Sequence, residues 1–200
     1  MKKVLLSLGA ALLMAAGAQA QTGYGLKAGV NLPKFKVSGG DSDYTSDAST
    51  NFYITGYTNL NVAPNFAIQP GVSLQGKGGK TELAGIETTT NLMSIEIPVN
   101  AVYYIPTGTS GSVFLGAGPY VGFNISGQTK TGDAKNDIEF GSNLTEMKRV
   151  DYGANFLAGY KLSNGFLINA GYGLGLGNLS NSDNIKSNNR VLSFGVGFEF

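Results

Sequence analysis

The side chains best suited to chemistry in this sequence are five charged residues in segments of alternating polarity. The 200 residues include no histidine and no cysteine, which removes the commonest general base, thiolate nucleophiles and thiolate metal sites. Catalysis would then need a serine–lysine or a carboxylate pair, and Glu96 and Asp151 are the only candidates for the latter. Lys27, Lys161 and Glu199 hold equivalent positions in other segments.

Two glycine-rich stretches look like nucleotide or phosphate loops but lack their context. The glycines from Gly171 to Gly177 recur at every second position within a strand pattern, so close packing is the favoured interpretation. The stretch 76–80 lacks the helix of a P-loop, and we interpret it as the exit of a strand. Acidic residues in 41–43 and 133–137 lack EF-hand spacing and read as solvated loops. We therefore expect no catalytic residues, cofactor or metal site.

The first 20 residues have the pattern of a cleavable signal peptide. Lys2 and Lys3 precede the apolar run 4–16, and the small–x–small sequence 18–20 follows it. Cleavage after Ala20 would leave residues 21–200 with 12 basic and 13 acidic residues, a net charge of −1. The chain is thus expected to be exported, and its charge argues against binding to nucleic acid.

From Tyr24 onward the dominant pattern is the two-residue alternation of β-strands. Apolar residues take even positions in six segments and odd positions in the fourth and fifth. The eight predicted strands span 24–32, 52–60, 66–76, 93–105, 113–125, 150–162, 166–176 and 190–200.

The two faces of these segments differ in a direction that argues against a soluble protein. The apolar parity holds 49 residues, of which only Arg190 is charged, whereas the opposite parity has 41 residues with 13 glycines. A soluble barrel would have to pack the 49 residues of the apolar parity inside, and its solvent-exposed face would be rich in glycine with only five charges. Facing the apolar set to lipid removes both problems, and leaves room inside for Lys27, Glu96, Asp151, Lys161 and Glu199.

The links between segments alternate between long and short. Those at 33–51, 77–92, 126–149 and 177–189 are long, and those at 61–65, 106–112 and 163–165 are short. Short periplasmic turns with longer outer loops are typical of outer-membrane barrels, and closing the sheet also protects its edges. We therefore predict an all-β fold, an eight-stranded antiparallel up-and-down transmembrane β-barrel in the bacterial outer membrane.

Several short motifs give this pattern a specific resemblance. In order they are GLKAGVN at 25–31, IQP at 68–70, IEIP at 95–98, GAGPY at 116–120, GYGLG at 171–175 and GFEF at 197–200. Together they resemble the outer-membrane β-barrel domain family of Bacteroidetes, labelled "porin family" or PorT-like, which is similar in shape to small OmpA/OmpX-type barrels. That family usually has an acidic residue after the proline of the third strand. Gly71 stands there in this chain, so one interior charge contact is expected to be missing.

The predicted function is a structural or surface-interaction role through extracellular loops, without enzymatic activity. The stretch 76–80 would approach lipopolysaccharide phosphates, and the loops would contact outer-membrane lipids or an unidentified extracellular ligand. The alternative is a narrow pore or gated channel for small solutes, while a lipid enzyme and a soluble lipocalin-like binder are less favoured. For the five lumen charges, a salt-bridge network that plugs the barrel is favoured over a polar pathway.

The last predicted strand carries a further expectation about biogenesis. Its apolar residues recur at every second position up to an aromatic end: Leu192, Phe194, Val196, Phe198 and Phe200. By resemblance to other outer-membrane barrels, this pattern is the signal read by the barrel-assembly machinery through strand addition. The alternative is that Phe200 only supplies an aromatic residue at the membrane interface.

Overall fold

The computed structural model describes residues 22–39, 43–83, 85–182 and 184–200. The predicted signal peptide, 1–20, lies outside the described residues. Within the described ranges, no helix is long and apolar enough to cross a membrane. The structure is built from ten strands: β1 (Thr22–Ser38), β2 (Tyr44–Thr45), β3 (Asn51–Ala63), β4 (Phe66–Leu83), β5 (Ile86–Pro106), β6 (Gly111–Thr131), β7 (Ala134–Asp137), β8 (Val150–Leu162), β9 (Phe166–Gly175) and β10 (Lys186–Glu199).

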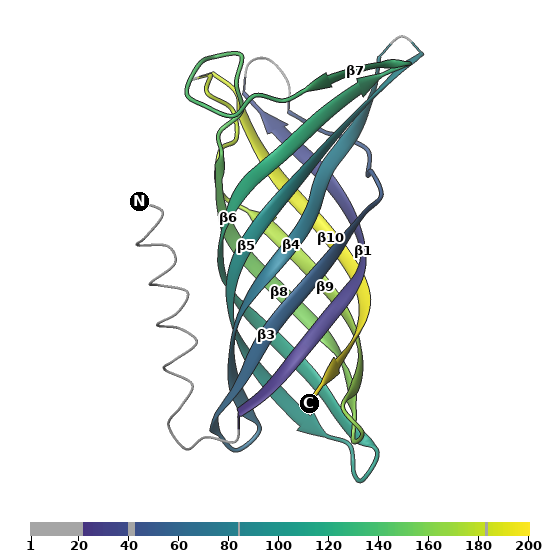
Figure 1. Ribbon diagram of the computed structural model, residues 1–200, viewed down its shortest axis with the longest axis vertical. Helices are drawn as coiled ribbons and strands as arrows, with labels where there is room; N and C mark the ends of the chain where they lie inside the picture. The colour runs from purple at the N-terminus through teal and green to yellow at the C-terminus, as the bar shows by residue number, and fades with distance from the viewer. Residues whose placement is uncertain (1–21, 40–42, 84, 183) are drawn as a thin grey trace.

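Eight of these strands close into a barrel, as predicted (Figure 1). Each pairs antiparallel with its neighbours in the order β1, β3, β4, β5, β6, β8, β9 and β10, and β10 pairs back onto β1 from Gly25↔Glu199 to Ser38↔Lys186. The short strands β2 and β7 add to β1 and β6 at the end of the barrel that carries the long connections. Closure gives the β1 edge a partner, which removes the edge of an open sheet.

The predicted assignment of the two faces is confirmed by exposure. On β10, Phe194 and Val196 point outward and are each 50 % exposed, whereas Val191 points inward and is buried. The odd positions of β5 and β6 point outward instead, as shown by Tyr103 and Leu115, while Glu96 is buried inside. The bulky apolar set therefore covers the outside of the barrel.

The strands extend well beyond the predicted segments at one end. The link 77–92 was expected to be a long loop, and this is wrong: β4 and β5 stay paired from Lys77↔Leu92 to Leu83↔Ile86. β6 likewise continues to Thr131 and pairs with β5 and β7 there. The physical reason is that both faces of a strand outside the membrane meet water, so no apolar alternation marks it in the sequence.

The opposite end has short turns. Two residues, 64 and 65, join β3 to β4, and residues 163–165 join β8 to β9. In the second turn Gly165 has a φ of +92°, a value that glycine adopts without steric cost, and its N–H donates to the Leu162 carbonyl.

Hydrophobic clusters lie inside the barrel near both ends. The turn-side cluster contains Ala67, Val102, Tyr104, Phe114 and Leu167, all buried. The loop-side cluster contains buried Phe35, Leu92 and Leu179, and is covered by partly buried Val37, Ile138, Phe140 and Met147. Polar and charged side chains fill the lumen between the two.

Candidate functional site

The five charges predicted for the lumen all lie inside the barrel, where the structure divides them between two ion-pair groups and one separate lysine. Glu96 and Asp151 lie toward the long-loop end and share Lys77. Glu199 and Lys161 pair toward the short-turn end. Lys27 stands apart from both pairs.

Lys77 is the centre of the first group and was missed by the sequence reasoning. It is 2 % exposed, its Nζ lies 2.7 Å from Asp151 Oδ2, and it forms a second ion pair with Glu96. The interpretation of 76–80 as a strand exit reaching lipopolysaccharide phosphates is therefore wrong for Lys77. Continuing the inward parity of 66–76 by one residue would have placed this side chain in the lumen.

Asp151 is held by neighbours from three other strands. Its Oδ2 accepts hydrogen bonds from Lys77 Nζ, from Asn189 Nδ2 at 3.1 Å and from Tyr120 Oη at 3.3 Å. Lys77 Nζ also lies 4.7 Å from the centre of the Tyr120 ring. With Asp151 and Asn189 fully buried and Glu96 3 % exposed, these contacts replace the water that the charges have lost.

The second group surrounds Glu199. Its carboxylate accepts hydrogen bonds from Lys161 Nζ at 2.6 Å, Tyr57 Oη at 3.2 Å and Asn59 Nδ2 at 3.3 Å. Lys161 Nζ lies 4.7 Å from the centre of the Tyr104 ring, which joins this group to the turn-side cluster.

Lys27 differs from the other lumen lysines. Its Nζ lies 4.2 Å from the centre of the Tyr57 ring, and among the described residues it forms no ion pair and no hydrogen bond. Gly71, paired with Tyr57 on the neighbouring strand, has no side chain to offer it. The position at which the resemblance predicts an acidic residue is thus paired with Tyr57, the residue whose ring contacts Lys27.

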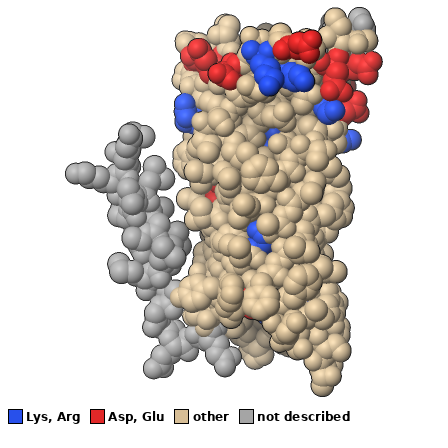
Figure 2. All heavy atoms as spheres, turned by 45° about the vertical axis from the view of Figure 1, so that its right-hand side comes forward, with Lys and Arg blue, Asp and Glu red and all other residues tan. Residues whose placement is uncertain are grey.

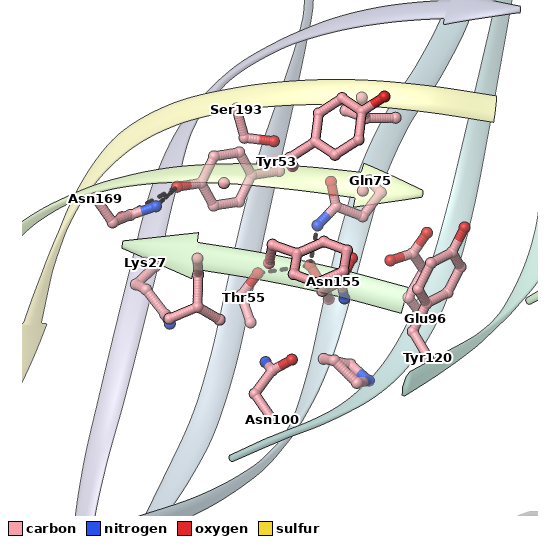
Figure 3. A pocket seen from close by; sticks show the side chains of 18 of the residues that line it. Lys27, Tyr53, Thr55, Gln75, Glu96, Asn100, Tyr120, Asn155, Asn169 and Ser193 are labelled. Carbon is pink, nitrogen blue, oxygen red and sulfur yellow. Dashed lines mark hydrogen bonds between the residues drawn. The ribbon is translucent and has the colours of Figure 1, made fainter. Parts of the chain in front are cut away.

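A cavity lies in the lumen beside Lys27 and the Lys77–Glu96 ion pair, lined by both polar and apolar side chains (Figure 3). We call it the central chamber. Its volume is about 90 Å³, which is enough space for ordered water or a small ion. Each of the eight barrel strands contributes to its wall. One lining residue from each strand, in chain order, is Lys27, Tyr53, Ser73, Glu96, Tyr120, Asn155, Asn169 and Ser193.

Comparison with known proteins identifies the architecture. A family model described as outer membrane protein beta-barrel domain matches residues 18–181. The chain belongs to this family. The barrel therefore lies in the bacterial outer membrane, and the short turns of such barrels face the periplasm while the long loops face outward.

Solved structures similar to this barrel share little sequence with it. OprG of Pseudomonas aeruginosa aligns with a TM-score of 0.51 and 12 % identity over 90 % of this chain and 97 % of that one. Neisserial surface protein A aligns with a TM-score of 0.48 and 14 % identity over 88 % of this chain and 95 % of that one. Ail of Yersinia pestis aligns with a TM-score of 0.46 and 13 % identity over 89 % of this chain and 98 % of that one. No curated protein matches the chain. At such identities the likeness to OprG concerns the fold alone.

The extracellular end carries most of the surface charge on the face shown in Figure 2. A groove of about 700 Å³ lies there, against the extended β4, β5 and β6. Lys80, Lys130 and Lys135 line it together with Glu87, whose carboxylate pairs with Lys80 at 3.3 Å. We call it the lysine groove.

The loops beside this end are ordered by specific contacts. The Asn181 side-chain amide donates to the carbonyls of Gly141, Asn143 and Glu146 at 2.9–3.0 Å, tying two loops together. Hydrogen bonds from the backbone and side chain of Asn143 hold the pKa of Glu146 below its ordinary value. These loops also supply Ile138, Phe140, Met147 and Leu179 to the loop-side cluster.

The last strand ends at the periplasmic side. Phe200 is 80 % exposed, its N–H donates to the Tyr24 carbonyl, and its ring stacks edge-on against Phe198. This position is compatible with both an assembly signal and an interfacial aromatic residue, and the assembly signal stays a prediction.

Proposed function

We propose that this protein is a closed, non-enzymatic barrel whose extracellular end binds an anionic saccharide, with the lipopolysaccharide of its own membrane as the ligand. The observation that carries the proposal is the lysine groove. Three lysines face one glutamate there, and the glutamate is already paired with Lys80. Hydroxyl and amide side chains of Thr50, Thr89, Asn91 and Gln128 also line the groove and can bond sugar hydroxyls.

The position of the groove supports this ligand. The groove lies where the strands leave the membrane, so phosphate groups on the sugars of the outer leaflet are within reach of its lysines. The lumen supports a binding role over transport, because hydrophobic clusters lie near both of its ends and ion pairs occupy part of the space between them. The carboxylates Glu96 and Asp151 are engaged by Lys77, which leaves no free acid pair for catalysis there.

Within the family, we propose that the chain belongs to the Bacteroidetes PorT-like group, on the motifs that it carries in order from 25 to 200. Outer-membrane lipids would surround the wall, and the barrel-assembly machinery would insert the chain through its last strand. Both partners follow from the general biology of such barrels.

Replacing the three groove lysines tests the proposed ligand. The triple variant Lys80→Gln, Lys130→Gln and Lys135→Gln should bind purified lipopolysaccharide at least tenfold more weakly than the unchanged barrel, in surface plasmon resonance with detergent-solubilised protein. A matched control replaces Lys34, Lys36 and Lys186, exposed lysines at the same end, with glutamine. Equal loss in both triple variants would indicate non-specific attraction and would contradict a site in the groove.

Conductance measurements separate this function from the alternative of a narrow pore. The purified barrel should give no stable openings in planar bilayers, because the loop-side and turn-side clusters occupy the lumen. A variant that empties the turn-side cluster, Phe114→Ala with Leu167→Ala, serves as a comparison for what an opened lumen would conduct. Reproducible openings of the unmodified protein would favour the channel.

A further inference from the structure

Lys27 is a buried positive charge that forms no ion pair with any of the described residues. It is 9 % exposed and lies within the membrane-spanning part of β1, where an isolated charge is costly. Glu199 attracts it electrostatically, yet the Glu199 carboxylate is bonded to Lys161, Tyr57 and Asn59. The Tyr57 ring provides a partial counterpart at 4.2 Å. A full negative charge in contact with Lys27 is missing.

The central chamber lies directly beside this lysine, and the charges around it are unevenly paired. Lys27, Lys77 and Glu96 are the charged residues in its wall. Lys77 and Glu96 form an ion pair, and the other partner of Lys77, Asp151, does not line the chamber. The four charges in and behind this wall therefore sum to zero, but the two acids gather around Lys77 and leave Lys27 without an ion-pair partner.

Amide groups without partners face the same space. Asn100 is 7 % exposed, lines the chamber, and makes no hydrogen bond among the described residues, and its Oδ1 is buried without a partner. Asn155 also lines the chamber without a hydrogen bond to a described residue. In Figure 3, Lys27, Asn100 and Asn155 surround one space from different strands. Buried polar groups normally find partners, so this convergence indicates occupants: the Asn100 oxygen requires a donor such as water, while the Asn100 N–H groups and the Lys27 ammonium require an acceptor.

We propose that the central chamber binds one small monovalent anion, of the size of chloride, between the Lys27 ammonium and the Asn100 amide. Such an ion supplies the missing negative charge and accepts N–H hydrogen bonds from both side chains. The hydrophobic clusters at the two ends of the lumen slow its exchange with bulk solvent. The ion is then a structural component of the barrel.

Linkage between binding and folding gives the first test. The barrel is unfolded reversibly by urea in detergent micelles, with sodium chloride replaced stepwise by sodium gluconate at constant ionic strength. An ion bound only by the folded state lowers the unfolding equilibrium constant about tenfold for each tenfold rise in chloride above its Kd. Stability of the unmodified barrel that does not depend on chloride would overturn the proposal.

Two variants and a control localise the effect. Lys27→Met removes the charge and should abolish the chloride dependence. Asn100→Asp places a carboxylate where the ion would lie, so the free energy of unfolding of this variant should not depend on chloride. Its value in gluconate should equal the value of the unmodified barrel in chloride. Lys36→Met, at an exposed position on the same strand, should keep the full dependence. Chloride dependence that survives in both Lys27→Met and Asn100→Asp contradicts this site.

A crystal structure of the unmodified barrel tests the site directly and does not depend on whether a variant folds. Crystals of the unmodified barrel grown in sodium bromide should show an anomalous bromide peak beside Lys27 Nζ. Water density without anomalous signal in the chamber, at a bromide concentration that saturates the stability effect, would mean that the chamber holds water alone and that the proposal is wrong.

Discussion

Replacing Lys77 with methionine is expected to destabilise the barrel by about 3–5 kcal/mol, the usual cost of removing one partner of a buried ion pair. The change leaves Glu96 and Asp151 without their shared cation, at positions with almost no access to solvent. Urea unfolding in detergent micelles, followed by circular dichroism and by the gel shift between folded and boiled protein, measures the loss.

A compensating variant shows whether the loss comes from charge. Lys77→Met combined with Glu96→Gln and Asp151→Asn keeps the shapes but removes all three charges, and should recover more than half of the lost stability. Lys161→Met is the matched comparison. Its partner Glu199 keeps hydrogen bonds from Tyr57 and Asn59, and Lys161 itself has a side chain 25 % exposed, so the loss should be smaller. Strict additivity of the three changes would mean that the charges are solvated independently.

Arginine placed on the outer wall is expected to have the second large effect. Phe194→Arg should cost roughly 2–4 kcal/mol, because Phe194 points outward near the middle of β10 and an arginine there meets the hydrocarbon of the membrane. Leu192→Arg and Val196→Arg should cost somewhat less, and Phe200→Arg at the interface about 0–1 kcal/mol. Asn136→Arg, on exposed β7 outside the membrane, is the control and should be neutral.

The inward positions of the same strand should respond by a different mechanism. At Gly195 an added Cβ would collide with Tyr53 Oη and the Ala28 carbonyl, so Gly195→Arg should fail to fold through crowding at any depth. Ser193→Arg would fill the central chamber. The outward series should therefore follow membrane depth, measured by unfolding in vesicles of different lipid chain length, and the inward series should not. Identical profiles would contradict the assignment of the two faces.

The sequence by itself determined the barrel, its strand order and which residues face outward. Lipid imposes one strong requirement on every spanning strand, a continuous apolar face, so alternation such as Leu192, Phe194 and Val196 records the orientation of each strand directly. The same reasoning placed Lys27, Glu96, Asp151, Lys161 and Glu199 inside. Their parity is a local property, and the tertiary structure does not alter it.

Only the tertiary structure decided which lumen charges meet. Lys77 lies 74 residues from Asp151 along the chain, and their contact depends on the tilt and stagger of strands around the closed ring. The extracellular extension of β4, β5 and β6, and with it the lysine groove, also emerged only there, because strands in water carry no apolar stripe. The isolation of Lys27 is likewise a property of the closed barrel, since it depends on which side chains seven other strands bring into the chamber.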